Sequence, residues 1–238
     1  MTAVATTERP CIAVVVFPGS NDDRDAVAAL ERLGAGAHRV WHTETSLPAA
    51  TAAVVIPGGF SYGDYLRCGA IAQFSPVMPA VTRFADAGGL VLGICNGFQI
   101  LTEAGLLPGT LRPNASLSFV CRDVALSVTR TDSPFTARCV EGLSLRIPVK
   151  HGDGCWFAAP DAVEALDAAG QILLRYEPGH NPNGSVGDVA GVCNEQGNVF
   201  GLMPHPEHAV DPLLGSTDGV PLLGSLVDAA LLSAAARV

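Results

Sequence analysis

The chain has 238 residues, of which 48% are hydrophobic and only 16% are charged, and its formal net charge is −9. This length suits one domain with a substantial core and is awkwardly short for two. The acidic balance argues against a nucleic-acid partner, and the lack of an 18-residue apolar stretch argues against a membrane-spanning helix.

The seven cysteines are scattered along the chain and include no CxxC pair. A disulfide framework or a zinc centre is therefore not expected, and we predict no metal site. Such cysteines suit a reducing, cytoplasmic environment. The first ten residues lack the basic and apolar pattern of a signal peptide. We expect residues 1–10 to be a loose tail and residues 11–238 to form a single domain, because no linker or repeat interrupts them.

The first half of the chain alternates between apolar, β-branched runs and helical patterns. Strands are predicted at 11–17, 38–41, 52–56 and 90–94, and helices at 22–33, 76–87 and 96–104. Continuous apolar runs are typical of parallel strands that are buried on both faces. The alternation predicts an α/β fold, with a mostly parallel sheet and helices on both of its faces.

The pattern changes from about residue 119 onward. Further strands are predicted at 119–128, 143–149, 171–176, 189–193 and 197–203, and a C-terminal helix at 221–236. Turns rather than helices separate most of these runs. We therefore expect some of them to extend the sheet with antiparallel strands.

The segment Gly93-Ile94-Cys95-Asn96-Gly97 follows an apolar strand and precedes a helix. Glycines on both sides of a nucleophile are typical of the nucleophile elbow, a strained turn between strand and helix. The helix N-terminus favours the thiolate, which is the reactive form of cysteine. We interpret Cys95 as a catalytic nucleophile rather than as a buried structural cysteine beside a tight turn.

A cysteine nucleophile needs a base, and His205 is the best placed of the six histidines. Pro206 biases His205 toward extended backbone, in which residues i and i+2 point the same way. His205 and Glu207 are therefore expected to face the carboxyl edge of the sheet together, where Glu207 would orient the imidazole. The alternative is an ordinary polar loop, since the HxE pattern alone is weak.

Acyl transfer also requires donors for the oxyanion. The backbone N–H of Asn96 is one candidate, and the turn Pro57-Gly58-Gly59, after another predicted strand, offers a second. Gln99 lies one helical turn after Cys95 and is a candidate for binding a polar group of the substrate. A plain turn and a solvated helix residue are the alternatives.

Three other polar segments are given minor roles. His151-Gly152-Asp153 is interpreted as a structural or interface element, with a catalytic role as the alternative. Residues 181–185 are interpreted as a loop, with a partner contact as the alternative. The run Asp22-Asp23-Arg24-Asp25 is interpreted as a solvated helix start, because acids there are favoured by the helix dipole.

Taken together, the motifs resemble the class I (triad) glutamine amidotransferases, which have a flavodoxin-like fold. The closest resemblance is to the glutaminase subunits of phosphoribosylformylglycinamidine synthase. It runs from about residue 11 to the C-terminus and is carried by FPGSN (17–21), PGGFSYGDYLR (57–67), GICNGFQILTEAGLLPG (93–109), IPVKHGDG (147–154), NPNGS (181–185) and GLMPHPE (201–207).

This resemblance implies that Cys95, His205 and Glu207 are catalytic and that Gly58 and Gly59 contact the oxyanion and the substrate, L-glutamine. Glutamine would be hydrolysed to glutamate and ammonia. The ammonia would pass to a large synthetase subunit that converts formylglycinamide ribonucleotide to the amidine in purine biosynthesis, with a small bridging subunit in the complex. No cofactor is implied for this chain, since ATP and magnesium belong to the synthetase.

The sequence departs from the family pattern at Asp22, Ser118 and His208, where cysteine, arginine and arginine are respectively common. None of these positions is expected to touch the predicted triad, so we expect the departures to affect partner contacts more than chemistry. Two rival functions remain open at this point: a stand-alone cysteine hydrolase that works without a partner, and a non-catalytic subunit that only binds glutamine. The complete Cys95, His205 and Glu207 set argues against the second.

Overall fold

The computed structural model describes residues 9–235. Its strands are β1 (Cys11–Val16), β2 (Gly36–Trp41), β3 (Thr51–Ile56), β4 (Leu90–Ile94), β5 (Thr110–Arg112), β6 (Val120–Val128), β7 (Ser144–His151), β8 (Cys155–Phe157), β9 (Ile172–Tyr176), β10 (Val189–Cys193) and β11 (Val199–Leu202). Its α-helices are α1 (Asp23–Arg32), α2 (Met78–Asp86), α3 (Asn96–Glu103), α4 (Pro160–Ala168) and α5 (Val220–Ala235).

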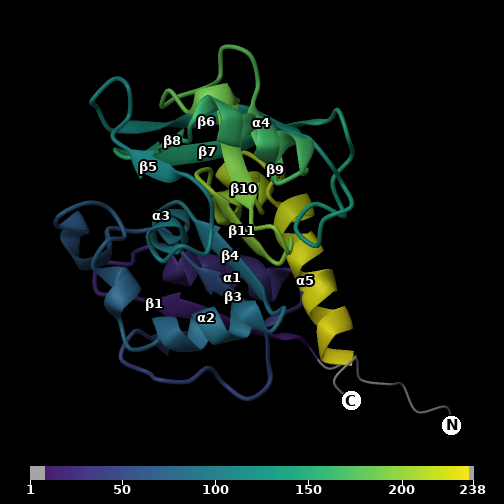
Figure 1. Ribbon diagram of the computed structural model, residues 1–238. Coiled ribbons are helices and arrows are strands. Elements are labelled where there is room, and N and C mark those ends of the chain that lie inside the picture. The colour runs from purple at the N-terminus through teal and green to yellow at the C-terminus, as the bar shows by residue number, and fades with distance from the viewer. Residues whose placement is uncertain (1–8, 236–238) are drawn as a thin grey trace, which may run out of the picture.

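Nine of these strands form one sheet in the order β2-β1-β3-β4-β11-β10-β9-β6-β7. The first five strands in that order are parallel to one another, and the rest pair in antiparallel fashion. Figure 1 shows the parallel half in the lower part of the molecule and the antiparallel half above it. The predicted fold class, a parallel core with an antiparallel extension, is confirmed.

Helices cover both faces of the parallel half. Strand β1 lies between β2 and β3. The connection from β1 to β2, which contains α1, therefore runs toward one end of the sheet, and the connection from β3 to β4, which contains α2, runs toward the other. Because such crossovers are right-handed, they place α1 and α2 on opposite faces. Helix α5 contacts α1, while α3 contacts β4 and β11. Every residue of β3 and β4 is buried, which explains their uninterrupted apolar sequences.

The register of the central strands brings three turns to one edge of the sheet. Ile56, at the end of β3, pairs with Gly93 in β4, and Leu202, at the end of β11, pairs with Ile94. The chain leaves all three strands at nearly the same level. This is the carboxyl edge, where open α/β sheets place their sites.

Some elements escaped prediction. Helix α4 has no buried residue, so its sequence lacks a clear apolar stripe. Strands β5 and β8, which form a separate two-stranded sheet, have three residues each and are too short to show a periodicity.

The two chain ends are described only in part. Pro10 is buried, and its carbonyl oxygen accepts a hydrogen bond from the N–H of Gly36, so the fold includes this residue. The rest of the expected tail, residues 1–8, and the predicted helix end at Ala236 lie outside the described residues. Among the helices of residues 9–235, none combines the length and the hydropathy that crossing a membrane requires.

Candidate active site

Cys95 lies in the turn between β4 and α3. Its backbone has φ 50° and ψ −103°, a combination that is costly for a residue with a side chain. The residue is 5% exposed, and its Sγ lies 3.8 Å from the carbonyl oxygen of Lys150 in β7. A strained cysteine at the start of a helix is the arrangement predicted for a nucleophile elbow.

Gly97 shows why this elbow needs a glycine on its helical side. A Cβ atom at this position would lie 1.9 Å from the carbonyl oxygen of Ile56, the last residue of β3. Helix α3 can therefore approach β3 this closely only without a side chain at position 97. The approach holds Cys95 next to the turn that follows β3.

His205 follows β11 and is paired with Glu207. The two residues are at most 2% exposed, and Nδ1 of His205 lies 2.6 Å from Oε1 of Glu207. The N–H of His205 donates to the carbonyl oxygen of Pro148, which ties the turn to β7. Nε2 of His205 has no hydrogen-bond partner in the part of the chain that the structure describes. It is therefore the ring nitrogen left to exchange protons with a nucleophile or a substrate.

The backbone conformation that brings Glu207 against His205 differs from the prediction. Pro206 does not continue an extended segment but begins a 3-10 turn, Pro206–His208, while His205 itself keeps non-helical backbone angles. The fixed φ of proline is compatible with both conformations, so the sequence did not distinguish them. The turn, rather than strand alternation, brings Glu207 back against the imidazole.

The surroundings of His205 favour its protonated form. Burial alone would lower its pKa, but the charges of Glu207 and Cys95 outweigh this effect and raise the pKa of His205 to about 10. An imidazolium beside Cys95 is the partner that a thiolate needs.

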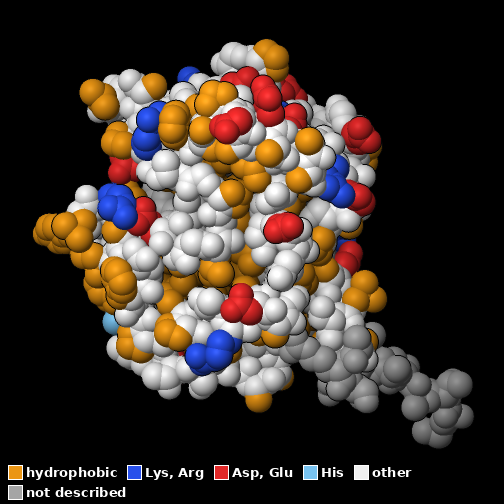
Figure 2. Space-filling view, viewed as in Figure 1, with side chains coloured by type: hydrophobic (Ala, Val, Ile, Leu, Met, Phe, Trp, Pro, Cys, Tyr) orange, Lys and Arg blue, Asp and Glu red, His pale blue; other side chains and the backbone are white. Residues whose placement is uncertain are grey.

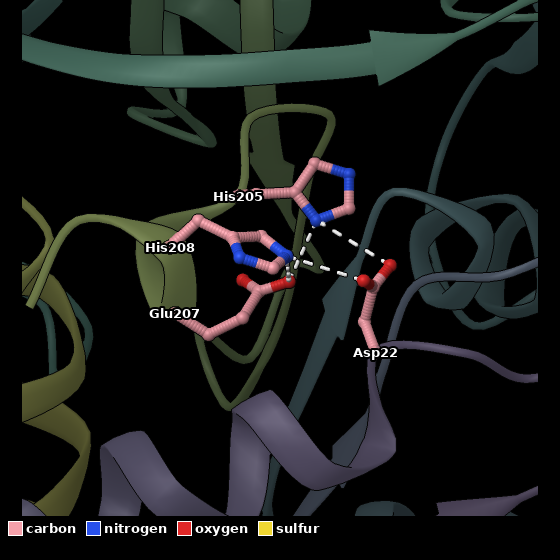
Figure 3. A group of neighbouring side chains, drawn as sticks. All are labelled: Asp22, His205, Glu207 and His208. Carbon is pink, nitrogen blue, oxygen red and sulfur yellow. Dashed lines mark hydrogen bonds and ion pairs between the residues drawn. The ribbon is translucent and has the colours of Figure 1, made fainter. Parts of the chain in front are cut away.

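A second group of charges adjoins the imidazole. Asp22 is 2% exposed, and its Oδ2 lies 3.8 Å from Nδ1 of His205. Its Oδ1 accepts a 3.1 Å hydrogen bond from Nε2 of His208 and a further one from the ammonium of Lys150. Figure 3 shows Asp22 reaching from the start of α1 toward both imidazoles, which come from the turn after β11. The interpretation of 22–25 as a solvated helix start is therefore wrong for Asp22 and for Asp23, which is also buried. The expectation that Asp22 and His208 do not touch the triad is wrong as well, because Asp22 faces His205 and His208 lies 3.7 Å from Oε1 of Glu207.

Among the described residues, four side chains of this cluster lie close enough together to be considered as metal ligands. One donor atom each from Asp22, His205, Glu207 and His208 lies within 4.8 Å of the others. The ammonium of Lys150 already bonds to Asp22, and Glu207 already bonds to His205. We interpret the cluster as a network of ion pairs.

A cavity of about 160 Å³ opens on Cys95. Its lining residues come from the segment after β3, from Cys95 and α3, from the residue before β6, and from the end of β7 and the turn that follows it: Gly59, Phe60, Asp64, Cys68, Cys95, Gln99, Phe119, Lys150, His151, Gly152 and Asp153. The Cys68 thiol donates to Oδ2 of Asp153 over 3.0 Å. Burial raises the pKa of Asp64, and the nearby charge of Asp153 raises it further. Asp153 belongs to the motif His151-Gly152-Asp153, interpreted from the sequence as a structural or interface element. Asp64, Cys68 and Lys150 were not predicted as site residues, because no spacing in the sequence places them beside Cys95.

The predicted substrate residues Asn96 and Gln99 are joined to one another. Nδ2 of Asn96 donates to Oε1 of Gln99 over 2.8 Å, and Nε2 of Gln99 donates to the carbonyl oxygen of Asp153 over 2.7 Å. Oδ1 of Asn96 accepts a bond from the N–H of Ser61. These side chains therefore hold the cavity wall together. The N–H of Asn96 lies in the first turn of α3, where no carbonyl of the helix can accept it.

The turn after β3 completes the group of predicted residues. A Cβ at Gly58 would lie 2.4 Å from Oδ2 of Asp22 and 2.7 Å from Cε1 of His205, so only glycine fits between them. Gly59 lines the cavity that opens on Cys95. The structure thus brings together every residue singled out from the sequence as catalytic or substrate-binding. Their individual roles stay predictions.

The remaining two motifs, at residues 151–153 and 181–185, make contacts within the antiparallel half. His151 is 3% exposed, and its Nδ1 lies 3.0 Å from Oδ1 of Asn114. Burial, followed by the charge of His205, lowers its pKa to about 4. Asn183 is also buried and donates to the hydroxyl of Tyr176 over 3.1 Å. These contacts are consistent with structural roles for His151 and for the 181–185 loop, whereas Asp153 of the same motif lines the cavity.

Exposed hydrophobic side chains lie on the turn region near the cavity. The rings of Phe60 and Phe119, both in the cavity lining, are stacked with centroids 6.4 Å apart. Tyr65, Leu66 and Phe74, in the segment between β3 and α2, are 74%, 91% and 81% exposed. Figure 2 shows hydrophobic side chains standing out at the left edge, where this segment lies in Figure 1. Such a patch is typical of a surface that binds another protein.

Comparison with known proteins gives consistent results. Residues 9–218 match the family model of the CobB/CobQ-like glutamine amidotransferase domain. The chain is 53% identical over 220 residues to phosphoribosylformylglycinamidine synthase subunit PurQ of Thermus thermophilus, covering 90% of this chain and 96% of that one. It is 55% identical to the subunit of the same name from Gloeobacter violaceus, covering 92% and 97% of the two chains.

Solved structures show the same relationship. A chain in the PurLQS structure from Thermotoga maritima superimposes with a TM-score of 0.85 and 44% identity, covering 92% of this chain and 98% of that one. A more distant structure from Thermoplasma acidophilum, at 16% identity and a TM-score of 0.61, shares the fold.

Proposed function

Because the chain belongs to the family of CobB/CobQ-like glutamine amidotransferases, we propose that it is the glutaminase subunit of a phosphoribosylformylglycinamidine synthase. It hydrolyses L-glutamine to glutamate and ammonia. The observation that carries the proposal is the gathering of Cys95, His205 and Glu207 at one sheet edge, in a chain that matches the PurQ subunits over nine-tenths of its length.

The reaction begins with the Cys95 thiolate, which attacks the side-chain amide carbon of glutamine. The N–H groups of Asn96 and Gly59 stabilise the oxyanion that forms, an effect of about 3 kcal/mol per donor. His205 then protonates the departing ammonia, and a glutamyl thioester remains on Cys95. His205 next takes a proton from water, which hydrolyses the thioester and releases glutamate. Glu207 keeps the imidazole in place through both steps.

The ammonia passes to a large synthetase subunit, which converts formylglycinamide ribonucleotide to formylglycinamidine ribonucleotide in purine biosynthesis. A small bridging subunit belongs to the same complex, as the PurLQS assembly from Thermotoga maritima suggests. ATP and magnesium are used by the synthetase and not by this chain. We place the complex in the cytoplasm, where the free thiols of this chain would stay reduced.

The decisive experiment compares two nitrogen sources in the assembled complex. Cys95→Ala should abolish synthesis from glutamine and leave synthesis from ammonium salts intact, because only the ammonia supply needs the thiol. Normal glutamine use by the variant would refute the proposal. A glutaminase assay with and without the synthetase separates this function from that of a stand-alone hydrolase, whose turnover would not depend on a partner.

A further inference from the structure

Asp22 stands at the start of α1, where an aspartate side chain usually caps the helix. It is the N-cap residue of α1, and aspartate at such a position commonly accepts a hydrogen bond from the first turn of its helix. The Asp22 side chain makes no such bond. Its carboxylate instead turns away from α1 toward the turn after β11, as Figure 3 shows. Helix capping therefore does not explain why this carboxylate is buried.

The surroundings of Asp22 are built to hold a charged carboxylate. A buried carboxylate is costly unless it is paired, and Lys150 and His208 both donate to Oδ1. The other oxygen, Oδ2, faces His205 at 3.8 Å from Nδ1. The absence of a side chain at Gly58 makes room for this contact, because a Cβ there would meet both Oδ2 and the imidazole.

We propose that Asp22 is a second positioning carboxylate for the catalytic imidazole, acting beside Glu207 to favour the imidazolium of His205 and thereby the thiolate of Cys95. This inference rests on the proposed glutaminase function. Glu207 accepts the short hydrogen bond from Nδ1, while Asp22 contributes its charge from 3.8 Å away.

The charges around His205 agree with this role. Burial would raise the pKa of Asp22, but the hydrogen bond from His208 and the charges of His205 and Lys150 lower it to about 2. The attraction between two opposite charges is mutual, so the charge of Asp22 at 3.8 Å also favours the imidazolium, by less than that of Glu207 at 2.6 Å from the same nitrogen. The other titratable groups near the imidazole are Glu207, Cys95, His151 and His208, whose ring centroid lies 5.3 Å from that of His205. Lys150 opposes Asp22 by neutralising part of its charge.

The test measures the pH dependence of kcat/KM for glutamine hydrolysis by the full chain in complex with its synthetase partners. Asp22→Asn should shift the alkaline limb downward by about 1–2 pH units, because an opposite charge at this distance changes a pKa by that amount. Alkylation of Cys95 by iodoacetamide near neutral pH should slow in this variant, because a less stable imidazolium supports less thiolate. Lys150→Met should shift the alkaline limb upward, because it leaves the charge of Asp22 unopposed.

Asp23→Asn is the matched control. Asp23 is the next residue and is also buried, but its carboxylate pairs with Arg39 at 3.1 Å. This variant should leave the pH profile unchanged. Thermal unfolding identifies the variants that fold, and Lys150→Met carries the test if Asp22→Asn does not fold.

Two outcomes would overturn the inference: a loss of activity in Asp22→Asn without movement of the alkaline limb, or no effect at all. A downward shift in Lys150→Met would also contradict it. None of these results touches the proposed function, which fails only if the wild-type complex does not use glutamine or if Cys95→Ala still does.

Discussion

Oε1 of Glu207 lies 2.6 Å from Nδ1 of His205, and both side chains are almost completely withdrawn from solvent. A carboxylate can only accept at this bond, so it fixes Nδ1 as a donor and leaves Nε2 to exchange protons. The second oxygen of Glu207 has no hydrogen-bond partner among the described residues. The hydrogen bond of the carboxylate therefore goes to Nδ1 of His205, while Nε2 of His208 lies farther from Oε1, at 3.7 Å.

Glu207→Gln should lower kcat by about 10²-fold, the smaller end of what a positioned acid–base group contributes, because His205 and Cys95 remain. KM for glutamine should change little, since Glu207 does not line the cavity that opens on Cys95. Steady-state glutaminase kinetics on the complex check both expectations. A loss as complete as that of Cys95→Ala would show that Glu207 does more than orient the imidazole.

The sequence predicted the sheet and the gathering of Cys95, His205 and Glu207 at one of its edges because both depend on local signals. Buried parallel strands leave continuous apolar runs, and an elbow leaves glycines on both sides of its nucleophile. The strand registers then bring distant turns to one edge without any further information. Asp22 illustrates the limit of this reasoning. An acidic residue at a helix start is favourable when it is solvated, and only tertiary packing places Lys150 and His208 against it.

The roles of Asn96 and Gln99 were equally hidden in the sequence. Helical spacing placed Gln99 near Cys95, but it gave no sign that both ends of the amide are bonded within the protein. Hydrogen bonds between side chains far apart in the sequence depend on the assembled fold. Single-sequence patterns do not contain them.

Gly97→Ala should destabilise the protein by about 1–3 kcal/mol and abolish glutaminase activity together. The added methyl group would collide with the carbonyl oxygen of Ile56 and push α3 away from β3. Chemical denaturation and glutaminase assays measure the two effects. Gly36→Ala is the control, because a Cβ there would meet no atom closer than 3.9 Å. Full activity in Gly97→Ala would contradict the role given to this close approach.

The ionisation of His205 should be visible in the pH dependence of stability. Its pKa is raised from 6.5 to about 10 in the folded protein. A raised pKa contributes stability that is fully present below pH 6.5 and is lost as the pH rises toward 10. The difference in melting temperature between the wild type and His205→Gln should therefore shrink over that interval. His180→Gln, at an exposed residue, is the control. A difference that stays constant with pH would mean that the imidazolium does not stabilise the fold.

The exposed hydrophobic residues beside the cavity should mediate docking of the synthetase subunit. Leu66 is 91% exposed on the segment that also carries Asp64 and Cys68 of the cavity lining. An ammonia donor has to present its site to its acceptor, so this region is the expected contact. Leu66→Ser should weaken association with the synthetase and lower glutamine-dependent synthesis. Ammonium-dependent synthesis by the complex should persist.

Leu232→Ser provides the comparison for this surface. Leu232 is 71% exposed on α5, which lies on the right of the molecule in Figure 1, away from the segment between β3 and α2. Replacing it removes a similar apolar area, so its effect on solubility should be similar, but association with the synthetase should be unchanged. Sedimentation or light scattering of the mixed subunits measures association directly. Equal weakening by both variants would show that loss of apolar surface in general, rather than docking beside the cavity, accounts for the effect.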